Sequence, residues 1–408
     1  MKTELNLKSF AKTLAAQNES KRDFIVNTKA HKLSIFAQDF EQGPYALGFK
    51  TPQRRGPARD EEFVINRFAL NQIAQHVKIP MQVVDLLSKG SIRERIELGN
   101  LLSVRLQENE SIRMIRTMAE MDSKLVMGSQ YCRAFLSDRY RRIDNFDLAQ
   151  EAIMPVLNQF DEDDLKIESL AVTEERMYIK ALCPPMSYEI GKVKVEGRKV
   201  GDIVQAGIVI SNSEVGAGRF SIEPLIFRLC CLNGAISQDY SMKRNHVGAA
   251  NGTELNGMAE ELFSTNTLAL TDAALFAQIR DTLEGTFSDE DKFEKIVTRF
   301  METKGEPITG QVPAAVQELG KRYTLNEGET AGIMDFLIKG GDLSKFGMVN
   351  AITAFARDDE KKMTYDRATQ LEKVGGQVIE LGKAEWKTIA EAVEEGTKKG
   401  RGRKTNNN

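Results

Sequence analysis

Four β-type runs between residues 165 and 222 constrain the fold of this chain more than any other feature. Leu165 to Val172 and Arg176 to Cys183 are joined by a short polar connector, which is the pattern of a β-hairpin. Ile203 to Ser211 is almost entirely apolar, as expected of a strand covered on both faces. A glycine-containing turn then precedes Arg219 to Ile222, which we interpret as the returning strand. The sequence therefore predicts an antiparallel β core in the middle of the chain.

Two segments of this core have more than one interpretation. Pro184-Pro185 ends the second strand, and the following SYEIGKVKVEGRKVGD interleaves basic residues with valines and glycines. This segment predicts either a solvated β-ribbon or a ribbon that presents ammonium groups on one side. Pro224 can begin a helix that ends at Asn233-Gly234, but an apolar strand fits the same residues.

Helical periodicity flanks the core on both sides. Residues 68–87 read as two helical runs that Ile79-Pro80 separates. The turn lacks the glycine typical of a DNA-reading helix-turn-helix, so we interpret the pair as a packed helical hairpin. Asn145 is a candidate N-cap for a helix over 146–158. Further helices are expected over residues 5–26, 92–108, 265–303, 311–322, 328–339, 345–356, 365–371 and 384–392.

These patterns predict an α+β fold, in which N-terminal helices and a mainly helical carboxy-terminal half flank a central antiparallel β-hairpin core of the β-β-β-α kind. We divide the chain into five segments: an N-terminal helix and strand segment with a basic linker (1–60), a helical subdomain (61–125), the β-rich α+β core (126–250), a helical carboxy-terminal region (251–395) and a disordered basic tail (396–408). The tail is either a solubilising end or a mobile arm that contacts phosphates.

Composition narrows the cellular setting. No apolar run approaches the length needed to span a membrane and no signal peptide is recognisable, so we expect a cytoplasmic protein. The net charge of −3 provides no overall positive field for nucleic acid, so any such binding must use local patches. The four cysteines, Cys132, Cys183, Cys230 and Cys231, lack the paired spacing of a zinc site, and we expect reduced, buried thiols.

Known catalytic motifs are absent from the sequence. Gly216-Ala217-Gly218 begins like a dinucleotide fingerprint, but Ser221 occupies the position of the third glycine. No Walker A loop, HExxH motif or nucleophile elbow occurs. Only three histidines are present, which argues against a multi-histidine metal centre. We therefore predict a protein that is not an enzyme and has neither a cofactor nor a metal site.

Basic side chains beside aromatic or β-branched ones mark the candidate nucleic-acid-binding site. A single strand requires a basic groove with aromatic platforms on which bases stack. The residues that meet this description are Arg139, Tyr140, Arg141, Arg142, Lys192, Lys194, Arg198, Lys199, Arg219, Phe220, Lys243 and Arg244.

Three stretches resemble a known family. SDRYRRIDNFDLAQEAIMPVL, GIVISNSEVGAGRFSIEPLIFRLCCLNG and NAITAFARDDEKKMTYDRATQLEKVGGQVIEL are similar to the uncharacterised phage/plasmid-like protein family, domain of unknown function 932. The resemblance covers roughly residues 60 to 385. It implies an origin in a bacteriophage, prophage or plasmid, and it carries over no activity and no catalytic residues.

Two functional hypotheses follow. The first is a DNA-binding protein of a mobile element that binds or anneals single strands during recombination, because the helix and paired hairpins over 146–233 resemble the β-β-β-α cores of single-strand annealing proteins, which commonly form ring-shaped homo-oligomers. The alternative is a protein-interaction module, an accessory or anti-defence factor that binds a host protein through its helical carboxy-terminal half.

Overall fold

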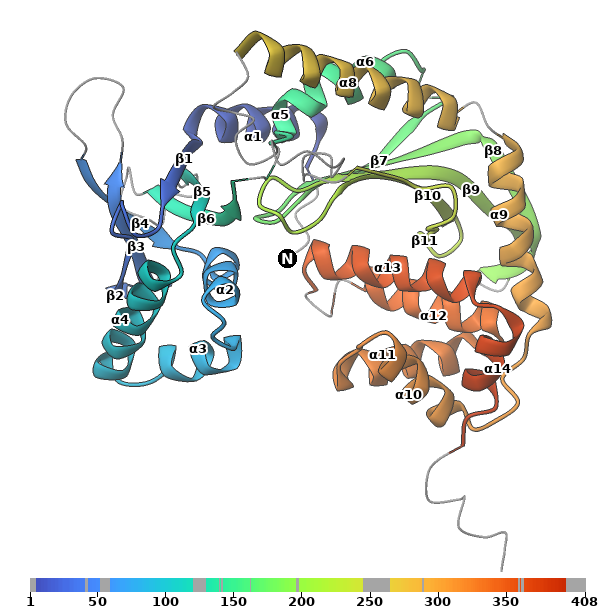
Figure 1. Cartoon of the computed structure of the whole chain (residues 1–408). Coiled ribbons are helices and arrows are strands. Elements are labelled where there is room, and N and C mark those ends of the chain that lie inside the picture. Colours follow the sequence, from blue (N-terminus) through green and yellow to red (C-terminus); the bar gives the residue numbers. More distant parts are fainter. Residues whose placement is uncertain are drawn as a thin grey trace, which may run out of the picture.

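The computed structural model has an α+β fold, which confirms the predicted fold class (Figure 1). It describes residues 5–40, 43–51, 59–119, 130–138, 140, 142–161, 163–195, 198–244, 265–287, 290–358, 360 and 363–393. Within these ranges, no helix has the length and apolar character required to cross a membrane. The predicted basic tail lies outside them.

The first sheet takes its strands from both sides of the boundaries predicted at residues 60 and 125. Its order is β1-β5-β6-β4-β3-β2, and only β4 and β6 pair in parallel. No sequence pattern predicted β5. The described residues between Arg22 and Ser137 therefore form one sheet with its helices, which differs from the predicted boundaries. The strands are β1 (Arg22–Asn27), β2 (Ser34–Phe40), β3 (Gly43–Thr51), β4 (Arg59–Ile65), β5 (Ile112–Ala119) and β6 (Gln130–Ser137).

Three helices, α2 (Arg67–His76), α3 (Met81–Ser88) and α4 (Ile92–Glu108), pack against this sheet around one apolar cluster. The Asn66 side chain accepts a hydrogen bond from the backbone of Ala69 at the start of α2. Ser91 and Glu94 form a reciprocal capping box at the start of α4. The helical hairpin interpretation of this segment agrees with the structure.

The second, central sheet has the order β11-β10-β9-β8-β7, and β12 also pairs with β10. Pro184-Pro185 does not end a strand, because β8 continues past them through a bulge between Cys183 and Ser187. The strands are β7 (Lys166–Val172), β8 (Met177–Val195), β9 (Arg198–Asn212), β10 (Phe220–Arg228), β11 (Asn233–Ile236) and β12 (Met242–Arg244).

The helix proposed from Pro224 is wrong, and the alternative strand interpretation is confirmed as β10. Pro224 lies between the part of β10 that pairs with β12 and the part that pairs with β11. Its carbonyl accepts a hydrogen bond from the backbone of Ser237, which follows β11. Because the nitrogen and the carbonyl of one residue point to the same side of an antiparallel strand, the Pro224 nitrogen faces the space between β11 and β12. The missing N–H of the proline therefore interrupts neither ladder.

Helices cover both faces of the central sheet (Figure 1). One face is covered by α1 (Leu7–Ser20), α5 (Asn145–Leu148), η1 (Ala149–Ile153), α6 (Met154–Leu157) and α8 (Thr265–Phe287). The opposite face is covered by α12 (Lys345–Arg357) and α13 (Tyr365–Glu380). Around these two helices lie α9 (Glu290–Glu302), α10 (Val312–Arg322), α11 (Glu327–Gly340) and α14 (Lys383–Ala390). The helical carboxy-terminal half is thus confirmed.

The helix predicted over 146–158 contains a π-helical turn, η1. Pro155 has no N–H to donate to the carbonyl of Glu151, and Arg280 of α8 donates to that carbonyl instead, at 2.5 Å. The N-cap is Asp144 rather than Asn145. Asn145 is drawn inward, where its backbone donates to Glu214 and its side-chain oxygen accepts from Asn212.

Buried ion pairs join α12 and α13 to the central sheet. Lys180 of β8 lies 2.5 Å from Glu372 of α13, and Arg357 of α12 lies 3.0 Å from the same carboxylate. Glu223 of β10 pairs with Lys373 of α13. Burial opposes the charge of Glu372, but Lys180 and Arg357 outweigh it and lower the pKa of this carboxyl group. The layer between sheet and helices is therefore held in one register by charge as well as by apolar contact.

Arg116 of β5 connects the two sheets. Its side chain is 1% exposed and lies 2.9 Å from Asp23 and 2.6 Å from Asp144. It also donates to the backbone carbonyl of Glu214, in the loop between β9 and β10. Arg133 of β6 pairs with the Glu214 carboxylate at 2.6 Å. This loop is thus fixed against the first sheet by two arginines.

We expect Arg116→Met to lower the free energy of unfolding by about 3–5 kcal/mol, because it leaves buried carboxylates without their partner. Urea unfolding followed by circular dichroism measures this change. Arg67→Met is the control, since Arg67 forms an exposed pair with Asp85 and its loss should move the midpoint little. Equally small effects of both substitutions would contradict the structural role of Arg116.

The same network predicts a pH dependence. Burial alone would raise the pKa of Asp144, but Arg116 and Lys21 outweigh it and hold this pKa well below its usual range. A carboxyl group with a depressed folded-state pKa stabilises the fold above its unfolded pKa of about 4, and this stabilisation is lost as the pH falls. The difference in unfolding free energy between the wild type and Asp144→Asn should be largest near neutral pH and shrink below about pH 4. A constant difference across this range would contradict the assignment.

Candidate nucleic-acid interface

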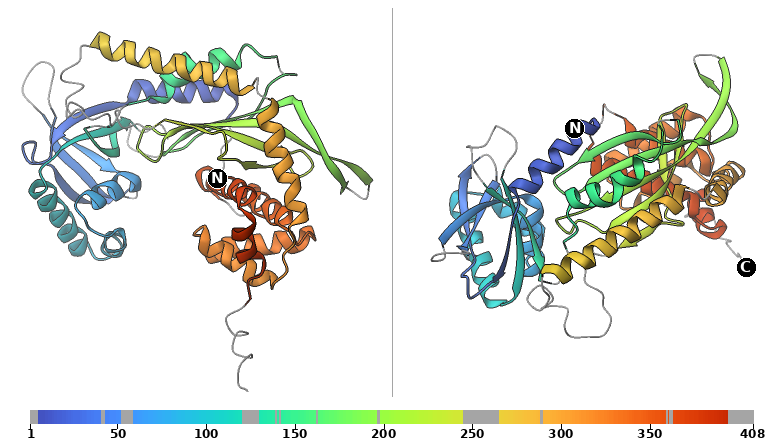
Figure 2. Two further views of the ribbon diagram at one scale, coloured as in Figure 1. Left: turned by 45° about the vertical axis from the view of Figure 1, so that its right-hand side comes forward. Right: turned by 90° about the horizontal axis from the view of Figure 1, so that it is seen from above.

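The central sheet narrows to a two-stranded ribbon at one end. β7 pairs with β8 only as far as Leu182, and β10 pairs with β9 only from Val204 onward. Beyond these residues β8 and β9 pair only with each other in the part of the chain that the structure describes. Figure 2 shows this hairpin extending away from the sheet. We refer to residues 187–195 and 198–203 as the ribbon.

One face of the ribbon carries lysines. Lys192 is paired with Gly201, and Lys194 with Lys199. Because residues alternate between faces along a strand, Lys192 and Lys199 lie on the same face, and Val193 and Val200 lie on the other. Both of these lysines are exposed, and neither has an ion-pair partner among the described residues. The side chains of Lys194 and Arg198 lie outside the described part.

Contacts with the body hold the base of the ribbon. The Lys304 ammonium donates to the carbonyl of Ile190 at 2.6 Å and lies over the ring of Phe346. Gly191 has a φ of +148°, a conformation that side chains disfavour. Asp202, which is paired with Gly191 in the ladder, accepts two hydrogen bonds from Arg228. The lysine-bearing end therefore extends from an anchored base.

The other predicted residues lie at the far end of the sheet. The strand from Tyr178 to Lys194 spans roughly 50 Å at about 3.3 Å per residue. Ser211 pairs with Tyr178, and β10 continues the ladder to β12, where Phe220 pairs with Arg244. The structure thus divides the predicted set into two groups. Tyr140, Arg142, Arg219, Phe220, Lys243 and Arg244 are far from Lys192, Lys194, Arg198 and Lys199.

Both predicted aromatic platforms are buried, which corrects that part of the prediction. The Tyr140 hydroxyl donates to the carbonyl of Ser213 at 2.7 Å, and the residue is 9% exposed. Phe220 is 0% exposed and belongs to the apolar cluster between the central sheet and the helices that cover this face. A base cannot stack on either ring without unfolding of the surrounding core. In the sequence, the arginines beside these two aromatic residues suggested platforms for base stacking. The local pattern alone could not distinguish a stacking platform from an aromatic residue packed in the core.

Apart from Arg219, the charged residues at this end are engaged by acids or lie outside the described part. Lys243 is 3.7 Å from the Glu223 carboxylate, and Arg142 is 3.4 Å from Asp23. Arg219 is exposed. Arg139, Arg141 and the side chain of Arg244 lie outside the described residues.

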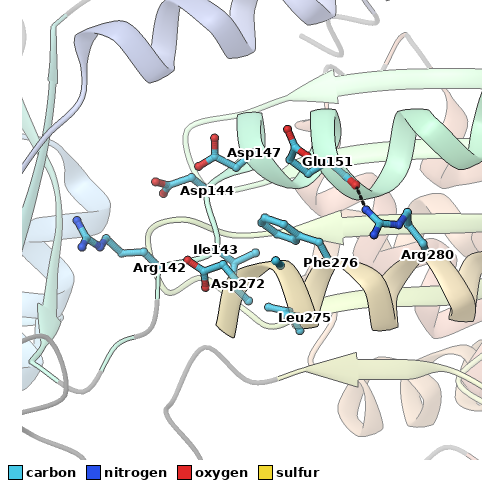
Figure 3. A pocket seen from close by; sticks show the side chains of 10 residues that line it. Arg142, Ile143, Asp144, Asp147, Glu151, Asp272, Leu275, Phe276 and Arg280 are labelled. Carbon is cyan, nitrogen blue, oxygen red and sulfur yellow. Dashed lines mark hydrogen bonds between the residues drawn. The ribbon is translucent and has the colours of Figure 1, made fainter. Parts of the chain in front are cut away.

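Arg142 also lines a pocket of about 540 Å³ between η1 and α8 (Figure 3). Four carboxylates share this pocket, from Asp144, Asp147, Glu151 and Asp272, and Arg280 is the other basic residue. Burial raises the pKa of Asp147; Lys21 opposes this effect, whereas Asp144 and other nearby carboxylates add to it. The excess of acids disfavours a phosphate here. This end of the molecule therefore gives little support for an anion site.

Neither a metal site with three or more protein ligands nor a catalytic histidine finds support in the described part. No group of three or more His, Cys, Asp or Glu residues there is arranged to hold a metal ion. His76 contacts Arg113 and Ser111 through its ring nitrogens. Burial lowers the pKa of His76, and Arg113 lowers it further, although a hydrogen bond with Asn109 opposes this. These contacts indicate that His76 has a structural role.

Comparisons of the chain with family models, with curated proteins and with solved structures found no match. The resemblance to the phage/plasmid-like family therefore rests on the quoted residues alone and stays a prediction.

The burial of Phe220 predicts a stability defect rather than a binding defect. Phe220→Ala should lower the free energy of unfolding by about 3–5 kcal/mol, because it leaves a cavity in the core. Arg219→Ala, at the neighbouring exposed position, is the control and should leave the unfolding midpoint nearly unchanged. Urea titration measures both. An unchanged stability of Phe220→Ala, together with weaker oligonucleotide binding, would restore Phe220 as a stacking platform.

Proposed function

We propose that this protein binds nucleic acid through the lysine-bearing face of the ribbon. The observation that carries the proposal is the exposure of Lys192 and Lys199 on one face, without acidic partners among the described residues. Exposed ammonium groups bind phosphates and release condensed counterions, which supplies affinity without sequence preference. A two-stranded ribbon also has the dimensions to follow a nucleic-acid groove.

The burial of Tyr140 and Phe220 shapes the proposal further. Without these platforms, the ribbon would contact the sugar-phosphate backbone and leave the base edges free. Free base edges are what a protein that anneals single strands has to preserve. We therefore keep DNA strand annealing in a phage or plasmid as the proposed role, with backbone contact in place of stacking.

A few lysines per chain give weak binding, so the proposal includes a homo-oligomer. Each copy would add a ribbon to the same strand, and linked weak contacts multiply into a high overall affinity. Such an assembly would also explain how a chain with a net charge of −3 can bind a polyanion.

The alternative, a protein-interaction module, has one observation in its favour. Apolar side chains are exposed on α3 and α4, most of all Leu86 at 72%, with Val83, Ile92 and Ile96 at 40–47%. Exposed apolar residues in neighbouring helices are typical of protein interfaces. These exposed apolar side chains lie in the amino-terminal part of the chain, whereas the hypothesis placed docking on the carboxy-terminal helices.

Anisotropy titrations with labelled single- and double-stranded oligonucleotides at several salt concentrations test the proposal. The double variant Lys192→Ala/Lys199→Ala should bind more weakly and flatten the slope of log K against log salt by about 1.4–1.8, since each lysine removes about 0.7–0.9. The control, Lys339→Ala/Lys387→Ala, removes the same charge from exposed helical positions and should retain wild-type binding.

Equal losses in both double variants would contradict a specific role for the ribbon. No binding by the folded wild type at low salt would reject the nucleic-acid proposal and favour the interaction module. The mass in solution, recorded on the same samples, tests the oligomer.

A further inference from the structure

Two adjacent cysteines lie at the turn between β10 and β11. The sulfur atoms of Cys230 and Cys231 are 3.5 Å apart. Cys231 is exposed and Cys230 is half-buried, so the expectation of buried thiols holds only for Cys132 and Cys183. The following Leu232 has a φ of +49°, which folds the turn tightly. Both thiols are therefore presented together at the surface.

Fixed charges hold this turn. Arg228 donates to the sulfur of Cys231 at 3.6 Å, and the thiol of Cys230 donates to Asp202 at 3.4 Å. Arg228 and Asp202 are paired at 2.7 Å, and Arg228 also donates to Asn350 of α12 at 3.1 Å. The positions of both sulfurs are thus set before any ligand arrives, which lowers the cost of binding.

The spacing suits chelation better than a disulfide. The Cα atoms of adjacent residues are about 3.8 Å apart, below the range of about 4.4–6.8 Å in ordinary disulfides, so a bond between these cysteines would be strained. Two thiolates at about 2.3 Å from one shared ion, with sulfurs 3.5 Å apart, subtend an angle of about 100° at that ion. This angle is close to tetrahedral.

We propose that Cys230 and Cys231 form a vicinal-dithiol site that chelates a soft, thiophilic metal or metalloid ion through both sulfurs. Soft thiolate donors select such ions. The protein supplies two ligands, and the remaining positions of a four-coordinate ion are filled by solvent or a small ligand. This site is independent of the proposed nucleic-acid function, although Asp202 places it at the base of the ribbon.

Both sulfurs bind an ion as thiolates. Chelation displaces a proton from each thiol, so the affinity for an ion should rise with pH.

Phenylarsine oxide is the probe, because a stable adduct requires two neighbouring thiols. Two arsenic–sulfur bonds replace the arsenic–oxygen bond, and both thiol protons leave with the oxygen as water, with no change in oxidation state. Intact-mass analysis of the folded full-length protein should show one adduct per chain. The adduct should persist in excess glutathione and be removed by a dithiol. Alkylation mapping should show that the probe protects Cys230 and Cys231, with no change at Cys132 or Cys183.

Cys230→Ser and Cys231→Ser should each abolish the glutathione-resistant adduct, whereas Cys132→Ala and Cys183→Ala should retain it. Because the mapping uses the wild type, the test does not depend on the folding of any variant. No adduct in the native protein, or a glutathione-resistant adduct in Cys230→Ser, would overturn the proposal.

Discussion

The buried guanidinium of Arg116 is the interaction on which the arrangement of the two sheets depends. It extends from β5 in the first sheet, pairs with Asp23 of β1 and Asp144 before α5, and donates to the carbonyl of Glu214 beside the central sheet. A buried arginine of this kind is stabilising only when all its donors find fixed acceptors. The loop between β9 and β10 supplies one of these acceptors, the carbonyl of Glu214. Residues 216–220 thus follow directly on the part of the loop that Arg116 and Arg133 fix against the first sheet.

The ribbon lies at the opposite end of the central sheet, and its geometry depends on how its base is anchored. Isolated two-stranded hairpins are marginally stable in water, so its lysines can hold a defined spacing only if the base is fixed. Lys304 on the Ile190 carbonyl and Arg228 on Asp202 provide this anchoring. The apolar core of the central sheet lies between the Arg116 contacts and the ribbon. It therefore holds a basic ribbon in place although the net charge of the whole chain is negative.

The helical half and most strands of the central sheet could be predicted from the sequence, because their signals are local. The Ser91-Glu94 capping box and the 3.6-residue periodicity after residue 265 mark helices directly. The prediction failed where a distant partner decides the structure. Pro224 is tolerated in a strand because it lies between two partner strands, and β5 is covered by neighbours from separate parts of the chain. Tyr140 and Phe220 have the residue types of a binding platform, yet the tertiary fold buries them. The alternation of basic and apolar residues was enough to find the ribbon lysines. Their distance from the other candidate residues became clear only from the pairing register of β8 and β9.

Hydrogen–deuterium exchange with and without a saturating oligonucleotide tests whether the ribbon is the nucleic-acid contact, because it locates the contact without any substitution. We expect slower exchange concentrated in residues 187–203, with little change at residues 213–220. Protection confined to residues 213–220, or to α3 and α4, with none in the ribbon, would contradict binding through the ribbon.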